Sequence, residues 1–289
     1  MKISQLFEQK QIFSLEVFPP KRDLSESTIY STLDALGGIS PDFISVTYGA
    51  GGTGSDNKAE KIASDIKNKY HTESVMHMPC IYMNEEDVMQ LLEKLKQDGI
   101  TNIMALRGDR VPDRDPANRF YYASDLIRFI RKSEYSSDFD ITAACYPEGH
   151  NESRSLSDDI DNLKRKVDAG ADHLITQLFF DNSYFYDFAD RATAAGINLP
   201  IEAGIMPVLN SKQIARMVTL CGVSLPKKFV RVMEKYGDDP QRMADAGIAY
   251  AIDQIVDLAA NDVDGIHLYT MNKPEVAIKI HQATKKLLR

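Results

Sequence analysis

The sequence predicts an α/β fold, a closed (β/α)8 barrel of the TIM-barrel type, on three observations. Eight short apolar runs alternate with helical patterns along the 289 residues, and strands that alternate with helices pair in parallel. The strand–helix units recur about every thirty residues, except for a longer seventh unit, which suits a run of βα repeats. No linker rich in Pro, Gly or Ser interrupts them, so residues 1–289 are expected to form a single barrel domain.

A doubly wound open sheet is the structural alternative. Eight consecutive units without a domain break make it the less favoured interpretation. The glycine cluster Gly49–Gly54 follows the second predicted strand rather than the first, and its spacing does not match G-x-G-x-x-G. A Rossmann domain is therefore not expected.

The predicted strands are short and mostly apolar, as parallel strands covered on both faces should be. Several stop at proline, which cannot donate a hydrogen bond to a ladder. The eight runs are Phe13–Phe18, Phe43–Tyr48, Ser74–Met78, Ile103–Leu106, Asp140–Tyr146, His173–Phe179, Ile201–Met206 and Gly265–Thr270.

The predicted helices lie between these strands and end at capping signals. Asn84 is a typical N-cap, and Gly99, Gly170 and Gly196 stand where helices usually stop. Pro274 takes the first-turn position that proline favours. The helices are Ser25–Leu36, Asn57–Tyr70, Asn84 through Asp98, Tyr122–Glu134, Leu156–Ala169, Ser183–Ala195, two or three within Ser211–Asn261, and one from Pro274 to the end.

Composition indicates an ordinary globular chain in a reducing compartment. A net charge of -8 leaves no dispersed basic surface for nucleic acid, and no apolar run approaches the ~20 residues that span a bilayer. Cys80, Cys145 and Cys221 are too scattered for a disulfide framework or a zinc site. The N-terminus does not read as a signal peptide, so a cytoplasmic protein without nucleic-acid or membrane partners is expected. Apolar faces within Ser211–Asn261 leave a homo-oligomer open, although packing inside the chain is the favoured interpretation.

Polar side chains gather where the predicted strands end, and barrel enzymes carry their active sites at these ends. Most have an ordinary explanation. Thr47 can be a strand residue without a special role, His77 can be a hydrogen-bonded core histidine, and Arg107 and Asp109 can form a surface ion pair at the end of a strand. Glu16 is harder to explain, because a carboxylate inside an apolar strand with no adjacent cation is costly to bury. The set is Glu16, Thr47, His77, Arg107, Asp109, Tyr146, Glu148, His150, Gln177, Asn272 and Lys273. So many coincidences at one end predict an active site in the barrel mouth.

The motifs that the sequence lacks and those that it contains both limit the chemistry expected at this site. HExxH, EF-hand, P-loop and G-x-S-x-G motifs are missing, as is zinc-ligand spacing, so no metal is expected. On the helix after the fifth strand, Asp159, Asn162 and Lys166 share one face and Arg165 lies beside it. A solvated charged face is the ordinary interpretation. Cations near a barrel mouth can instead hold the phosphates of a large anionic, aromatic cofactor.

Seven motifs, in order along the whole chain, resemble those of methylenetetrahydrofolate reductases. They are Leu15–Lys21, Ser45–Ala50, Ala105–Asp109, Tyr122–Leu126, Ala144–Glu148, Leu163–Ala171 and Thr176–Asp181. The resemblance is to the short bacterial form, which consists of the catalytic barrel alone. It implies a FAD-dependent barrel that reduces 5,10-methylenetetrahydrofolate to 5-methyltetrahydrofolate with NADH or NADPH in ping-pong order. The product would supply methyl groups for methionine synthesis in one-carbon metabolism.

The resemblance also implies roles for single residues. Glu16 matches the general acid that protonates the folate at N10, and Asp109 matches the carboxylate beside flavin and folate. The positions that match the FAD-binding set are His77, Arg107, Gly108, Asp109, Tyr122, Ala123, Tyr146, His150, Ser153, Asp159, Asn162, Arg165 and Lys166. Thr47, Tyr48 and Ala50 match the nicotinamide side, and Glu16, Gln177, Gln213 and Lys273 match folate contacts, with Gln177 serving both substrates.

Two positions depart from the family pattern. Lys273 stands where arginine is usual, so a forked contact would become a point charge. Met217 stands where an aromatic ring can stack on the folate, and methionine can still pack on an aromatic face. The alternatives are another FAD barrel resembling proline dehydrogenase, a flavin-free pterin-binding barrel, or a non-catalytic folate- or flavin-binding protein. The sequence does not decide between NADH and NADPH.

Overall fold

A computed structural model describes residues 1–20, 25–48 and 58–288, without the side chains of residues 212, 213, 215 and 216. Its eight parallel strands close into one barrel in the order of the sequence, and β1 pairs with β8 to complete the ring. The predicted (β/α)8 barrel is confirmed. The strands are β1 (Ile12–Val17), β2 (Phe43–Val46), β3 (Glu73–Pro79), β4 (Asn102–Leu106), β5 (Asp140–Cys145), β6 (His173–Thr176), β7 (Ile201–Ile205) and β8 (Gly265–Tyr269).

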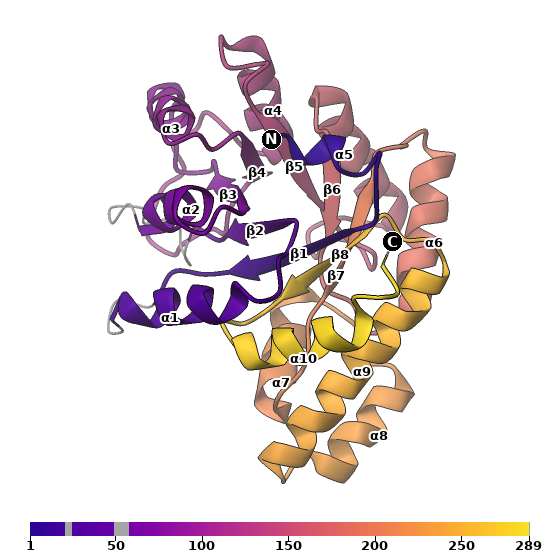
Figure 1. Ribbon diagram of the computed structural model, residues 1–289. Coiled ribbons are helices and arrows are strands. Elements are labelled where there is room, and N and C mark those ends of the chain that lie inside the picture. The colour runs from indigo at the N-terminus through magenta and orange to yellow at the C-terminus, as the bar shows by residue number, and fades with distance from the viewer. Residues whose placement is uncertain (21–24, 49–57, 289) are drawn as a thin grey trace.

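The helices surround the barrel (Figure 1), because each βα unit packs its helix on the outside of the sheet. Asn84 caps α3 as predicted, with its side chain accepting from the Asp87 backbone N–H. The helices are α1 (Ser27–Leu36), α2 (Lys58–Asn68), α3 (Glu85–Gln97), α4 (Ala123–Lys132), α5 (Leu156–Ala169), α6 (Asn182–Ala194), α7 (Ser211–Cys221), α8 (Lys227–Tyr236), α9 (Pro240–Ala260) and α10 (Pro274–Thr284).

The amino-terminal end of the barrel is closed by a short 3-10 helix, η1 (Ile3–Gln5), which the sequence patterns did not predict. Ile3 is fully buried in an apolar cluster inside the barrel. Its backbone N–H donates to Asn102 Oδ1 at 3.1 Å. Ser4 donates twice to the Asp140 carboxylate, from its backbone nitrogen at 2.8 Å and from its hydroxyl at 2.6 Å. These contacts leave the carboxyl ends of the strands as the end where ligands can enter.

Two strands end more than one residue earlier than predicted. β2 stops at Val46 and β6 at Thr176, rather than at Tyr48 and Phe179. The Gln177 N–H still donates to Cys145 O at 2.7 Å, so hydrogen bonding continues one residue past β6 before the chain turns away. Of the apolar residues that follow, Phe179 packs in the main core and Leu178 joins a separate cluster, which explains why their hydrophobicity was mistaken for strand.

That cluster belongs to the long seventh unit. Here α7, α8 and α9 extend below the ring of helices in Figure 1. Their buried apolar side chains pack against those that follow β6 and β7, and the buried members are Leu178, Phe180, Met206, Val208, Ile214, Val223, Phe229 and Met243. The apolar faces among these helices are thus covered at least in part by packing within the chain.

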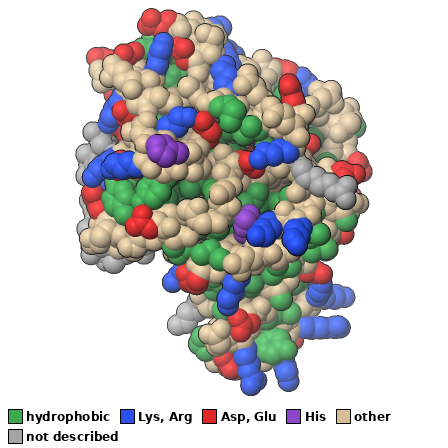
Figure 2. All heavy atoms as spheres, viewed as in Figure 1, with side chains coloured by type: hydrophobic (Ala, Val, Ile, Leu, Met, Phe, Trp, Pro, Cys, Tyr) green, Lys and Arg blue, Asp and Glu red, His purple; other side chains and the backbone are tan. Residues whose placement is uncertain are grey.

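The described surface carries charges of both signs. Figure 2 shows acidic and basic side chains interspersed over the face in view. Among the described helices, none combines the length and the apolar character that crossing a bilayer requires.

Candidate active site

A cavity of about 380 Å³ lies at the carboxyl ends of β4 and β5. Many of the side chains predicted for the site line it together: Arg107, Tyr122, Ala123, Tyr146, His150, Ser153, Asp159, Asn162, Arg165 and Lys166. Several others were not singled out from the sequence: Ala105, Leu106, Ser124, Ala144, Glu152, Arg154 and Asp158. Residues scattered over some sixty positions therefore meet in one concave site, as expected of parallel strands that end at the same rim.

The wall of this cavity is a loop held by the first turns of α5. Ser155 caps the helix, accepting from the Asp158 N–H at 3.1 Å. Asp159 is buried, and its Oδ1 accepts from the His150 N–H at 3.2 Å and from the Ser153 hydroxyl at 2.8 Å. Two of the predicted residues are thus positioned by a third, which gives Asp159 a structural task in addition to any contact with a ligand.

Cationic side chains reach the cavity both from the end of β4 and from α5. Arg107 forms a fork with the Glu152 carboxylate, at 2.5 Å and 2.7 Å, and this hydrogen bonding raises the arginine pKa despite its partial burial. Arg165 is exposed and donates to Asn162 Oδ1 at 3.1 Å. Glu152 was not predicted for the site. Its carboxylate binds the Arg107 guanidinium, which the resemblance assigns to cofactor binding.

Lys166 lies deeper than its neighbours. Its Nζ donates to the Ala144 carbonyl at 2.5 Å and lies 5.4 Å from the centre of the Tyr146 ring. Burial lowers the pKa of the lysine, although Cys145 and Asp159 oppose the shift. Burial likewise raises the pKa of the Tyr146 phenol. Amine and ring together form a polar and aromatic floor under the cavity.

Gly108 and Asp109 follow directly on β4. Gly108 has φ +85°, and a Cβ there would lie 2.8 Å from Pro79 Cβ. Glycine is required at this position for both reasons. The Asp109 side chain beyond it is exposed, and it is not among the described residues that line the cavity.

Glu16 lies on β1 between two histidines. Its Oε2 is 3.6 Å from His77 Nε2 and 3.7 Å from His267 Nε2. The Glu16 side chain is 18% exposed, whereas both imidazoles are almost completely buried. Burial lowers the pKa of His77, the nearby Glu16 opposes that shift, and His267 reinforces it. His77 is therefore neutral near pH 7, and Glu16 keeps contact with solvent at the mouth.

The remaining predicted residues lie around the rim. The Thr47 N–H donates to Val17 O at 3.1 Å, and Tyr48 is half-buried against the core. Gln177 Oε1 accepts from the Leu178 N–H at 2.9 Å. Lys273 is exposed at the N-cap of α10.

Three further positions complete the comparison with the sequence prediction. Ala50 lies outside the described residues, and the Gln213 side chain is not described. Met217 packs beside the cluster of α7, α8 and α9.

Glu148 and Asn272, also at the strand ends, have structural tasks. Glu148 Oε2 accepts from the Ser224 N–H at 2.8 Å, and burial raises the pKa of its carboxyl. Asn272 exchanges two hydrogen bonds with the Phe18 backbone, at 3.1 Å and 2.8 Å. The two hydrogen bonds of Asn272 hold the segment after β8 against the segment after β1.

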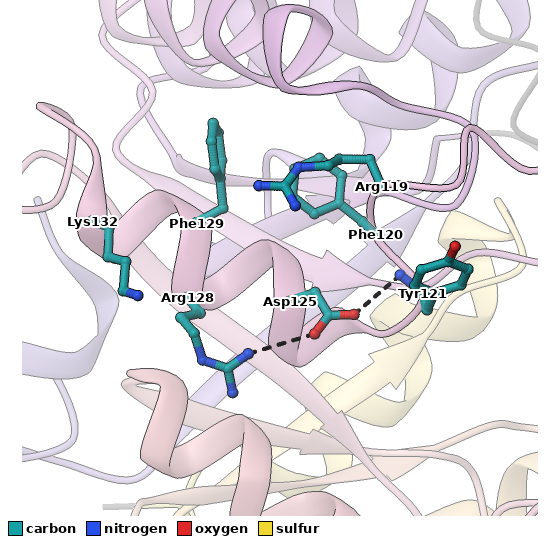
Figure 3. A pocket seen from close by; sticks show the side chains of 7 residues that line it. All are labelled: Arg119, Phe120, Tyr121, Asp125, Arg128, Phe129 and Lys132. Carbon is teal, nitrogen blue, oxygen red and sulfur yellow. Dashed lines mark hydrogen bonds and ion pairs between the residues drawn. The ribbon is translucent and has the colours of Figure 1, made fainter.

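A second hollow, of about 290 Å³, lies over the outer face of α4 (Figure 3). It is lined by Arg119, Phe120, Tyr121, Asp125, Arg128, Phe129 and Lys132. Asp125 accepts from the Tyr121 N–H at 3.1 Å and pairs with Arg128 at 3.5 Å, and Arg119 pairs with Glu85 on α3. Both arginines are thus engaged in ion pairs, Arg128 within α4 and Arg119 with α3. No residue predicted for the site is among the described residues that line this hollow.

Two buried residues inside the barrel were missed at the sequence level, although a signal for one of them was present. Glu202 lies inside the apolar strand β7 and is completely buried, the same pattern that drew attention to Glu16. His267 lies inside β8 and is also completely buried. Only the barrel closure, which pairs β1 with β8, brings His267 next to Glu16.

Comparison with known proteins gives a consistent result. A model of the methylenetetrahydrofolate reductase family matches residues 2–285. The 5,10-methylenetetrahydrofolate reductases of Pectobacterium carotovorum and Escherichia coli are each 36% identical over 267 residues, which covers 92% of this chain and 88% of theirs. A methylenetetrahydrofolate reductase (NADH) of Arabidopsis thaliana is 36% identical over 96% of this chain and 49% of its own.

Solved structures show the fold. A Clostridium thermocellum protein, described as binding two copies of 5-methyl-5,6,7,8-tetrahydrofolic acid, superposes with a TM-score of 0.69 at 14% identity, covering 99% of both chains. A tryptophan synthase structure from M. tuberculosis superposes with a TM-score of 0.54 at 12% identity, covering 98% of both chains. At these identities the likeness extends to the barrel alone.

Proposed function

The chain belongs to the methylenetetrahydrofolate reductase family, and from this premise we propose that it is a flavoprotein that uses FAD. The proposed reaction is the reduction of 5,10-methylenetetrahydrofolate to 5-methyltetrahydrofolate by NADH or NADPH in ping-pong order. The observation that carries the proposal is the cavity over β4 and β5, in which cations and aromatic side chains meet at the strand ends. Beside it, β3 brings His77 within 3.6 Å of the Glu16 carboxylate.

The donor set of the cavity fits FAD. Arg107, Arg165 and Lys166 supply positive charge for a diphosphate, and Arg is well shaped for it. Tyr122, which is largely exposed, and Tyr146 offer aromatic surface to planar rings. When bound, the flavin supplies hydride transfer, and the protein orients it and excludes competing reactions.

Glu16 is the proposed proton donor. Opening the imidazolidine ring of the folate requires a proton at N10, and a carboxylic acid held at the mouth can give it. After giving the proton, the carboxylate would face two imidazole Nε2 atoms at 3.6 Å and 3.7 Å. Either one, carrying a hydrogen, would stabilise the carboxylate so formed.

The rim residues are proposed to bind the two substrates in turn. Gln177 has an amide that can donate to either substrate, and Lys273 is free to reach the glutamate tail of the folate. Gln213 is proposed as a further folate contact, and Thr47, Tyr48 and Ala50 are proposed on the nicotinamide side. Asp109, whose side chain is exposed just after β4, is proposed to stabilise positive charge that develops on the folate.

The test is an anaerobic half-reaction followed at the flavin absorbance band. NADH or NADPH should bleach the purified yellow protein, and methylenetetrahydrofolate should then restore the colour. Glu16→Gln should keep the first half-reaction and lose the second. Restored colour at the wild-type rate in that variant would contradict the role of Glu16, and a colourless protein that does not take up FAD would contradict the flavin.

A further inference from the structure

A line of polar side chains crosses the barrel interior from β7 to the mouth. The Ser14 hydroxyl donates to Glu202 Oε2 at 2.5 Å and lies 2.7 Å from His267 Nδ1. The opposite nitrogen of that imidazole, Nε2, lies 3.7 Å from Glu16 Oε2. One hydroxyl and one imidazole therefore lie between Glu202 and Glu16, and the last separation, 3.7 Å, is one that a small movement of either side chain would close to a hydrogen bond.

The line is sealed except at its outer end. Ser14, Glu202 and His267 are each completely buried, and Glu16 alone keeps contact with solvent. Among the described residues, the atoms at its ends have no hydrogen-bond partner: Glu202 Oε1 at the inner end and His267 Nε2 at the outer end. Buried polar atoms are rarely left unpaired in folded proteins, so an unpaired nitrogen aimed at the proposed proton donor calls for a functional explanation.

The surroundings of Glu202 favour its protonated form. Burial raises its pKa to about 8, the Ser14 hydrogen bond opposes this shift, and the carboxylates of Asp42 and Asp264 reinforce it. No cation is among the groups that act on it. Near pH 7 Glu202 therefore holds a proton that an exposed glutamate would have released.

The hydrogen bonds along this line can point in two directions. The two arrangements differ in whether Glu202 or Glu16 holds the proton. With the proton on Glu202, Glu202 donates to Ser14, Ser14 donates to His267 Nδ1, and His267 Nε2–H faces an ionised Glu16. In the other direction Glu16 is protonated, His267 Nδ1–H donates to Ser14, and Ser14 donates to an ionised Glu202. Passing between the two breaks one O–H or N–H bond at each of the three donors and forms one at each acceptor. The imidazole stays neutral in both.

We propose that Glu202 is a positioning residue and the proton reserve of Glu16, which it reaches through Ser14 and His267. The proposal deepens the proposed function and rests on Glu16 as the proton donor to the folate. When the folate covers the mouth, solvent is displaced from Glu16 and the reserve supplies the proton. Glu16 gives it to N10, where an N–H bond forms.

The reserve is refilled through the mouth. After the product leaves, Glu16 takes one proton from solvent, and the line returns to the direction in which Glu202 is protonated. One solvent proton is consumed in each turnover, as reduction of the folate by a nicotinamide requires. His77 also faces Glu16 at 3.6 Å. Burial raises the pKa of the Tyr269 phenol, and the nearby Glu16 adds to that shift.

The first test detects the proton on Glu202 directly, without turnover. Infrared difference spectra of the wild-type holoenzyme should show the C=O stretch of a protonated carboxylic acid through neutral pH, titrating near pH 8. Glu202→Gln should remove that band. Glu60→Gln, which changes a buried glutamate on α2 that pairs with Lys94, should keep it. Absence of the band in the wild type near pH 7 would overturn the proposal.

The second test reads the transfer. The folate half-reaction of Glu202→Gln and of Ser14→Ala should slow about tenfold above neutral pH and recover at lower pH, because solvent can then protonate Glu16. In the wild type, the rate of the folate half-reaction should depend on the deuterium content of the water along a curve, because several protons move together. In both variants this dependence should be linear. The nicotinamide half-reaction and FAD content should match the wild type.

The outcomes separate the two proposals. If Glu16→Gln still reduces the folate, the proposed function of Glu16 fails. If Glu16→Gln is inactive in that half-reaction while Ser14→Ala and Glu202→Gln keep the wild-type pH profile and the curved deuterium dependence, only the reserve fails.

Discussion

Replacing Glu202 by glutamine should change how the stability of the protein depends on pH. The folded-state pKa of Glu202 is about 8, against an ordinary value of 4.5. Between these values the folded state binds more protons at Glu202 than the unfolded state does, so stability falls as the pH rises. Glutamine does not titrate, so the variant lacks this contribution.

The size of the effect follows from the shift. A difference of 3.5 pKa units between 4.5 and about 8 corresponds to about 5 kcal/mol when the whole range is crossed. Between about pH 5 and about pH 9 the part expressed is about 4 kcal/mol, because the unfolded glutamate is already partly ionised at the lower limit. The wild type should lose this amount relative to Glu202→Gln, whatever the other titrating groups contribute to both.

The assay is urea unfolding of both proteins, in the same cofactor state, at several pH values in this range. The quantity to follow is the difference in unfolding free energy between variant and wild type, at unchanged dependence on urea. Glu234→Gln, which alters an exposed glutamate on α8, should give a difference that does not change with pH. A constant difference for Glu202→Gln as well would refute the assignment of a protonated Glu202.

Three further predictions concern the cavity and the loop after β4. Glu152→Gln should tighten FAD binding up to about fivefold by releasing Arg107 from a partly exposed ion pair, which contributes at most about 1 kcal/mol; weaker binding in a titration of the FAD-free protein would mean that Glu152 itself contacts the cofactor. Gly108→Ala should destabilise the protein by about 1–3 kcal/mol in urea unfolding, and by more than Gly196→Ala, which has φ +74° but open space for a Cβ; equal losses would exclude a steric contribution. Asp109→Asn should slow the folate half-reaction while sparing the nicotinamide half-reaction, and an equal loss in both would indicate a general defect in flavin binding.

The fold could be predicted from the sequence because each βα unit carries its own signals. Leu156–Ala169 has the same bounds in the prediction and in the structure, since Ser155 caps one end and Gly170 turns into the left-handed region at the other. The strand ends have weaker signals. Hydrophobicity alone predicts the run His173–Phe179, but its last residues are apolar for other reasons, because Leu178 packs with α7, α8 and α9 and Phe179 packs in the main core.

The site was predictable in composition but not in its interactions. Residues of the cavity could be placed by the rule that parallel strands end at one rim. The Arg107–Glu152 fork could not, because the two residues lie 45 positions apart in segments whose relative position depends on the whole barrel. The same holds for Ser14, Glu202 and His267, which lie on three strands and meet only after the ring has closed.

The pairing of β1 with β8 also bears on how the protein is made. Glu16 leaves the ribosome well before His267 and Asn272, which lie about 250 residues further along the chain and complete the surroundings of β1. Until Gly265–Tyr269 emerges, β1 has one edge without its partner, and unpaired strand edges invite aggregation. A nascent chain should therefore remain a substrate for chaperones until β8 has left the ribosome, and the surroundings of Glu16 should be completed only then.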